Sequence, residues 1–367
     1  MKQPVTRNGI TLMQYVLLLH AAQVGTGVFS MPRQLAETSG TDGWICLLIA
    51  WAINGLVGWL MILSFRKYPD LELPDLLKHL FGKWLGKLLL LPIIAYFAYF
   101  SWITMINAML YIRSWFLIQT PEYVTVFLFA IPSYMILVHG PRILSRYAEL
   151  VFYLTMWMPL ILLVPMNDAR WIHLLPVLKE GWKPVMDGLG NTLYSFSGFE
   201  ILPFFYPYLQ KKQYAVHGML VANTLTVLFY LFVTIVCFMF FPPDGITTLN
   251  QPLLTLMKNI EFRFLERFDM IFLALYLFVV SKAWLPFVYC SLRSVSSLIG
   301  INPNRTLVAL YLGLVIFSMY LLQPTWNDAE NWQKPIVNAE KIVLIVLPVA
   351  LYFYVIGLER IRKWRAG

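Results

Sequence analysis

Long apolar runs, separated by short charged loops, fill almost the whole chain. Each run is predicted to be a transmembrane helix, because about 20 apolar residues cross the hydrocarbon of a bilayer. We recognise ten such runs, at about residues 12–35, 42–65, 86–119, 122–139, 143–165, 185–208, 214–241, 269–299, 304–322 and 337–358. The pattern predicts an all-α membrane protein that forms one polytopic domain over residues 1–367.

Two glycines interrupt the first run. Val24, Gly25, Thr26 and Gly27 lie in its middle, and a glycine costs about 1 kcal/mol against alanine inside a helix. At membrane depth, backbone leaves the helix only where protein or a water-lined cavity satisfies its N–H and C=O groups. We therefore predict a broken helix and a ligand site here. In the alternative interpretation, these glycines only allow two helices to pack closely.

The sixth run carries a similar interruption. It contains Ser195, Phe196, Ser197 and Gly198, with Glu200 close behind. Ten helices divide into a 5+5 inverted repeat, over about residues 12–165 and 185–358, in which the first and sixth helices correspond. Two broken helices at matching positions are typical of a transporter-type site. Free N–H groups at one helix end favour a carboxylate, and free carbonyl groups at the other accept from an ammonium group, so we expect a zwitterion.

Other polar residues within the runs are candidates for the same site. Thr104 and Asn107 share one face of the third run, where they contact either the ligand or a neighbouring helix. Lys282 lies near the middle of the eighth run, and a charge at that depth faces the interior or a partner. We expect Lys282 and Glu200 to act in coupling or gating, or else to form a structural ion pair.

Composition narrows the function. The chain is 59% hydrophobic and 13% charged, with a net charge of +9. Its basic residues lie in short loops and at the C-terminus, so we expect them to meet lipid headgroups, and we expect no nucleic acid. Lys and Arg are more frequent in the loops on the same side of the membrane as the two termini. Since cytoplasmic loops are richer in Lys and Arg, we expect both termini in the cytoplasm. The spacing of cysteine and histidine predicts no metal site and no cofactor, and catalytic motifs are absent, so we expect no enzyme.

Two motifs and several smaller ones carry a family resemblance. Gly25-Thr26-Gly27-Val28-Phe29 with Pro32 resembles the first-span motif of the amino acid–polyamine–organocation transporters, and Phe196-Ser197-Gly198-Phe199-Glu200 resembles their sixth-span motif. Within that superfamily the chain most resembles the spore germination permease family, the B subunits of germinant receptors. The length, the ten runs, Asp42-Gly43-Trp44, the segment 80–86 and Thr120-Pro121 carry this narrower resemblance.

The resemblance implies a function. It implies a multi-pass subunit in the inner membrane of the spore, which binds a small-molecule germinant, an amino acid, and signals to the A and C subunits of the receptor. It also implies that the Lys282 ammonium stands where sodium-coupled relatives hold a cation. The alternative is a proton-coupled amino acid transporter with the same fold.

Overall fold

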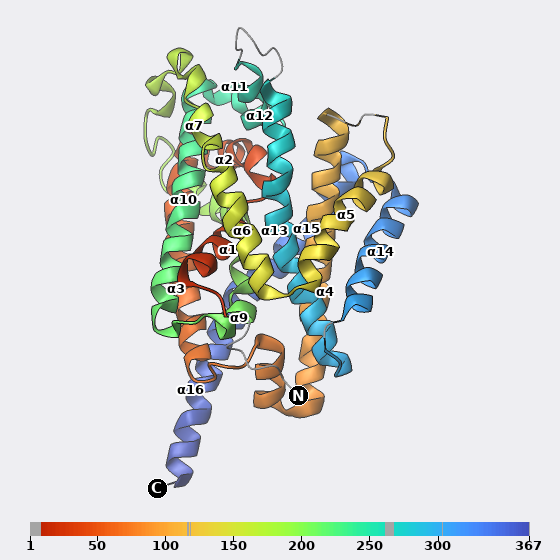
Figure 1. The fold of residues 1–367 in the computed structure, drawn as a ribbon. Coiled ribbons are helices and arrows are strands. Elements are labelled where there is room, and N and C mark those ends of the chain that lie inside the picture. Colours follow the sequence, from red (N-terminus) through yellow and green to blue (C-terminus); the bar gives the residue numbers. More distant parts are fainter. Residues whose placement is uncertain (1–8, 116, 118, 261–267, 303, 367) are drawn as a thin grey trace.

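The computed structural model describes residues 9–115, 117, 119–260, 268–302 and 304–366. In this part of the chain the regular elements are helices (Figure 1). The α-helices are α1 Leu12–Gln23, α2 Met31–Ser39, α3 Gly43–Arg66, α4 Leu73–Trp115, α5 Glu122–Val138, α6 Pro141–Thr155, α7 Met158–Ile161, α8 Lys183–Ser195, α9 Leu202–Phe205, α10 Ala215–Phe240, α11 Pro243–Thr247, α12 Pro252–Lys258, α13 Phe268–Ile299, α14 Arg305–Leu322, α15 Trp326–Lys341 and α16 Leu347–Ala366. The prediction of an all-α membrane protein is confirmed.

Seven helical segments in the described residues are long and apolar enough to cross a membrane. They are Met31–Arg66, Leu73–Trp115, Pro141–Asp168, Lys212–Phe240, Phe268–Ile299, Arg305–Leu322 and Trp326–Leu358. The shorter apolar helix α5 and the two interrupted segments account for the rest of the ten predicted runs. The number of ten spans and the inverted repeat stay predictions.

Large apolar side chains cover the outer surface of the bundle. Leu56 on α3, Leu88 on α4, Leu128 on α5 and Leu314 on α14 are all exposed. Soluble proteins rarely expose apolar surface on this scale, because it costs free energy in water. The outward faces of these helices are therefore suited to contact lipid.

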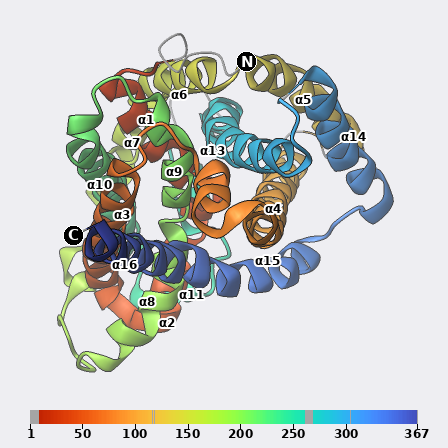
Figure 2. The ribbon, with the colours of Figure 1, turned by 90° about the horizontal axis from the view of Figure 1, so that it is seen from below.

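Helices distant in sequence pack side by side around the first segment. α4 runs along α13, α5 along α14, and α3 along α10, while α1 contacts α6, α10 and α13. The view along the bundle in Figure 2 shows α13 and α4 together, with α1, α3 and α10 beside them. α1 therefore lies in the interior, and its side chains are almost all buried.

The first apolar run is interrupted where its glycines indicate. α1 begins with a capping box between Thr11 and Gln14 and ends at Gln23. Val24 and Gly25 are extended, the 3-10 turn η2 (Thr26–Phe29) follows, and α2 begins only at Met31. α1 is thus a half-length helix of 12 residues, about 18 Å long at 1.5 Å per residue, which is too short to cross a bilayer alone.

The sixth run is interrupted as well. α8 ends at Ser195, and Gly198 has a φ of +121°. The 3-10 turn η6 (Phe199–Ile201), α9 and the 3-10 turn η7 (Tyr206–Tyr208) complete the segment. At its far end the backbone of Ile10 pairs with that of Tyr208 and Gln210, so the start of the first segment is tied to the end of the sixth.

Two segment boundaries differ from the sequence prediction. The third run is predicted to begin near residue 86, but the helical segment begins at Leu73. Its first part, residues 73–81, is a separate short helix, because the non-helical Gly82 (φ +80°, ψ 172°) divides α4 in two. The last run is expected to begin near residue 337, yet its helix begins at Trp326 as α15 and continues through a π-helical turn, η9 (Ile342–Val346), into α16.

Candidate functional site

The two helix interruptions lie directly against each other. A Cβ atom added to Gly198 would lie 2.6 Å from the backbone C and O atoms of Ala22 and 2.7 Å from the backbone N of Gln23. Contacts that short do not occur, and the φ of +121° is one that side chains other than glycine rarely adopt. Glycine at position 198 is therefore required both by space and by backbone conformation, and it lets the sixth segment touch the end of α1.

A polar network joins the end of α1 to the sixth segment and to α10. The Gln23 side-chain amide donates to the carbonyl oxygen of Phe196 at 3.3 Å. From α10, the Thr226 hydroxyl donates to Gln23 Oε1 at 2.6 Å, and the Tyr230 hydroxyl donates to the Gln23 carbonyl oxygen at 2.6 Å. His20 Nδ1 lies 3.0 Å from Thr226 Oγ1. Buried polar groups in such a network fix one arrangement, because each unpaired group would cost about 1–3 kcal/mol.

The carbonyl groups of the first break already have partners in the protein. Tyr276 of α13 donates its hydroxyl to the Gly25 carbonyl oxygen at 2.7 Å, as Tyr230 does to Gln23. From the sequence, the carbonyls freed at this helix end are expected to receive the ammonium group of a ligand. In the structure, two tyrosine hydroxyls occupy the Gln23 and Gly25 carbonyls instead.

Glu200 braces the turn of the sixth segment. Its buried carboxylate accepts from the Tyr96 hydroxyl at 2.7 Å, from the Gly198 N–H at 2.8 Å and from the Ser197 hydroxyl at 3.3 Å. Among the described residues it forms no ion pair with Lys282, so the alternative of a Lys282–Glu200 pair is wrong for this conformation. The contacts of Glu200 instead tie the sixth segment to α4.

A cavity of about 240 Å³ lies beside the first break. It is bounded by α1, α6, α10, α12 and α13, and both Val24 and Lys282 line it. Lys282 is only 3% exposed, and its Nζ atom lies 6.0 Å from the ring centroid of Phe152. Most of the remaining lining is apolar.

The other residues expected at the site lie elsewhere. Thr104 donates to the carbonyl oxygen of Phe100 within its own helix at 2.8 Å, and neither it nor Asn107 lines the cavity. Thr26 faces α4, where Tyr111 packs on Phe29 with ring centroids 5.0 Å apart.

Three further residues that the sequence predicts at the ligand site also lie outside the cavity lining. Gly27 is exposed, and Ser195 is half-buried. Phe196 is buried and makes an edge contact with Tyr230. The structure thus brings Val24 and Lys282 together at the cavity and joins the two breaks through Gly198.

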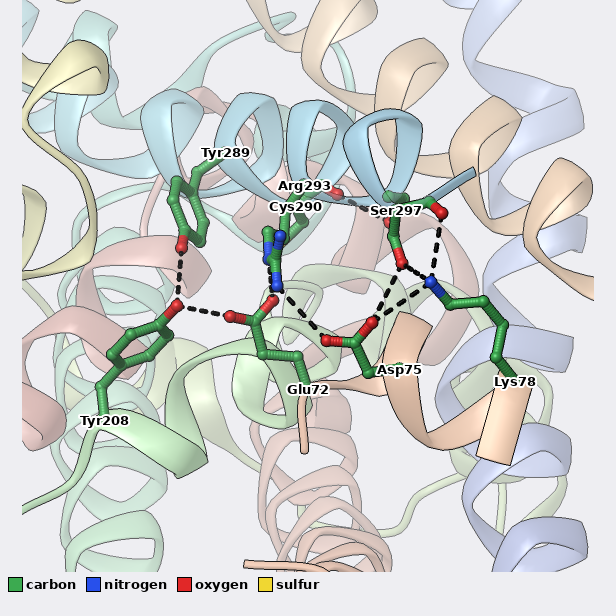
Figure 3. Close-up of polar contacts among 9 residues, drawn as sticks. Glu72, Asp75, Lys78, Tyr208, Tyr289, Cys290, Arg293 and Ser297 are labelled. Atoms are coloured by element: carbon green, nitrogen blue, oxygen red, sulfur yellow. Dashed lines mark hydrogen bonds and ion pairs between the residues drawn. The ribbon is translucent and has the colours of Figure 1, made fainter. Parts of the chain in front are cut away.

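A second polar cluster, which the sequence analysis does not predict, holds one end of α13 (Figure 3). Arg293 pairs with Glu72 and, at 3.3 Å, with Asp75. Asp75 also accepts from the Ser297 hydroxyl at 3.2 Å and pairs with Lys78 at 3.2 Å. We call these five residues the α13 ion cluster. It fixes the first turns of α4 to the end of α13.

Two tyrosines extend the α13 ion cluster toward the sixth segment. The Tyr208 hydroxyl, at the end of η7, donates to the Glu72 carboxylate, and the Tyr289 hydroxyl lies 3.5 Å from that of Tyr208 (Figure 3). Burial raises the pKa of the Glu72 carboxyl group above its ordinary value, while the charge of Arg293 opposes that rise. The cluster therefore joins the loop before α4, the end of the sixth segment and α13.

The fold defines a class: an all-α membrane protein whose long apolar helices surround two interrupted segments. Comparison with known sequences is more specific. A family model described as spore germination protein, of the spore permease type, matches residues 9–326. The chain belongs to this family of spore germination proteins.

Individual relatives are distant, and their matches cover 71% to 97% of this chain. Spore germination protein YndE of Bacillus subtilis (strain 168) is 24% identical over 97% of each chain. Spore germination protein GerQB of Bacillus cereus is 24% identical over 88% of this chain and 89% of its own length. Spore germination protein B2 of Bacillus subtilis (strain 168) is 27% identical over 71% of this chain and 72% of its own length.

Proposed function

We propose that this chain is the membrane subunit of a spore germinant receptor and binds a small nutrient, an amino acid or a close analogue, beside the first helix break. One observation carries the proposal: the broken ends of two segments, 173 positions apart at Gln23 and Phe196, meet in the interior next to a cavity of about 240 Å³. A ligand there contacts the first segment at Val24, and the neighbouring residue Gln23 is bonded to the sixth segment.

The arrangement suits a sensor. A ligand shifts a conformational equilibrium only through a difference in its affinity for the two states. The backbone of Gly198 touches α1, the Tyr230 hydroxyl holds the last carbonyl of α1, and the Tyr276 hydroxyl holds that of Gly25 in the break. A ligand in the cavity contacts α1, α10 and α13 together, so a difference in its affinity between two arrangements of these helices would transmit binding to the rest of the bundle.

Partners and location follow from the family. We propose that the chain lies in the inner membrane of the spore with both termini in the cytoplasm, and that it signals to an A subunit and a C subunit of the same receptor. The distribution of Lys and Arg supports this orientation. The apolar outer faces of α5 and α14 offer surfaces for lipid or for a partner helix.

The direct test replaces Gly198 by Ala in the intact receptor in spores. The added methyl group would lie 2.6 Å from backbone atoms of Ala22, so the two breaks must separate and the nutrient response should be lost. The matched control is Gly313→Ala on α14, where a Cβ atom meets nothing within 4 Å. Spores with the control should germinate normally. A normal nutrient response in Gly198→Ala spores with wild-type levels of the protein would refute the proposed site.

Uptake separates the sensor from the transporter alternative. The purified chain in liposomes should bind the nutrient without accumulating it. Concentrative uptake of a labelled amino acid, without the A and C subunits, would instead favour a proton-coupled transporter.

A further inference from the structure

The buried side chain of Lys282 faces the cavity beside the first break. Within the described part of the chain, Lys282 makes no hydrogen bond and no ion pair. Its one attractive polar contact is the distant face of the Phe152 ring, 6.0 Å from Nζ. An isolated ammonium group away from water is costly and normally has a partner. This group lines a cavity instead of meeting another side chain.

Other polar residues of the cavity wall each have a partner within the protein at one atom. His20 Nδ1 lies against Thr226, the Thr155 hydroxyl donates to the carbonyl oxygen of Val151 at 2.7 Å, and the Tyr276 hydroxyl donates to Gly25. No acidic side chain is among the described residues that line the cavity. The wall therefore offers one strong anion-binding group and no carboxylate for a cation.

The rest of the wall is apolar and limits the size of a ligand. It includes Leu162, Phe229, Phe232, Val233, Phe272 and Val279. A volume of about 240 Å³ corresponds to about eight waters at 30 Å³ each, which is less than the 300–1,000 Å³ typical of drug-sized ligands. Met156, an exposed side chain, lies on its rim, so the cavity has a route to the outer face of the bundle.

We propose that this cavity binds a small apolar monocarboxylate, with the carboxylate on Lys282 Nζ and a branched or aromatic body against the phenylalanines. This inference rests on the proposed function, because it names the chemical class of the nutrient. It also changes one expectation. The carboxylate is the essential group of the ligand, and an α-amino group contributes little, since the carbonyls of Gln23 and Gly25 are occupied.

A ligand series on the unmodified protein tests the proposal without any mutation. The purified chain in lipid nanodiscs is titrated with L-leucine, with isocaproate (which lacks the amino group) and with isoamylamine (which lacks the carboxylate), and binding is read by calorimetry. We expect isocaproate to bind at least as tightly as L-leucine, and isoamylamine to show no saturable binding. Binding of the amine, or of L-leucine without isocaproate, would overturn the proposal.

Variants of the lysine give the second arm. Lys282→Met should weaken isocaproate binding about tenfold to a hundredfold, as expected for the loss of a charge-assisted contact, while Lys282→Arg should keep part of it. The matched control is Lys334→Met, because Lys334 is exposed and bonds only to Asn331 among the described residues. Unchanged binding in folded Lys282→Met would overturn the proposal. Unchanged isocaproate binding in Lys282→Met would refute the carboxylate site alone. The germination test with Gly198→Ala would still test the proposed function, so the two proposals can be refuted separately.

Discussion

Replacing Arg293 by Met is expected to loosen the end of α13 more than the loss of an ordinary surface ion pair. Arg293 pairs with Glu72 and Asp75, and the three side chains are 18%, 5% and 19% exposed. Removing one partner of a buried pair costs about 3–5 kcal/mol, because the remaining charge stays buried. Since Arg293 and Asp75 are partly exposed, we expect the lower end of that range, about 3 kcal/mol.

The measurement is the apparent melting temperature of detergent-solubilised protein at one heating rate. A loss of about 3 kcal/mol corresponds to a decrease of roughly 6–12 °C, at about 2–4 °C per kcal/mol. The matched control is Lys212→Met. Lys212 pairs with Asp70 at 2.7 Å, but Asp70 is 74% exposed, so this pair contributes at most about 1 kcal/mol.

A double-mutant cycle isolates the pair itself. Glu72→Gln removes the carboxylate that Arg293→Met leaves without its partner. The double variant should therefore be less destabilised than the sum of the two single variants, by about 1 kcal/mol or more. Strict additivity, or equal decreases in melting temperature for Arg293→Met and Lys212→Met, would refute the assignment of the α13 ion cluster as a buried clamp.

Two further changes probe single contacts by the same melting assay. Tyr276→Phe leaves the Gly25 carbonyl without its donor and should cost about 1–3 kcal/mol; Tyr320→Phe, at an exposed position, should change nothing, and equal effects would contradict the role of Tyr276. Gly82→Ala meets no neighbouring atom but must adopt a φ of +80°, so it should cost about 1–3 kcal/mol, and an unchanged melting temperature would contradict a fixed bend.

Local features of the sequence were enough to predict the general fold. Apolar runs indicate helices because membrane thickness fixes their length. The glycine at position 198 marks an interruption because only glycine takes its φ so near another backbone. Each of these inferences uses neighbours in sequence. Val24 and Lys282 line one cavity, and a ligand site at the first break stays a prediction.

The partners of these residues were beyond sequence reasoning, because they come from remote segments. Tyr230 and Tyr276 lie more than 200 positions from the carbonyls that they bind, and in sequence they resemble any other aromatic residue of a membrane helix. Glu72 and Arg293 look like loop charges until the fold pairs them.

The contacts of α13 connect the cavity to the α13 ion cluster. Lys282 lies on the cavity and Arg293 in the cluster, 11 residues apart, or about 16 Å along a helix. Pro286 stands between them. A proline cannot donate to the carbonyl four residues earlier, which here is that of Lys282, so the helix lacks a hydrogen bond at this point. Under the proposed binding mode, a ligand on Lys282 would act one turn before Pro286, at this missing hydrogen bond. We infer that a bend there would displace Arg293, whose contacts reach the loop before α4 and, through Glu72 and Tyr208, the end of the sixth segment.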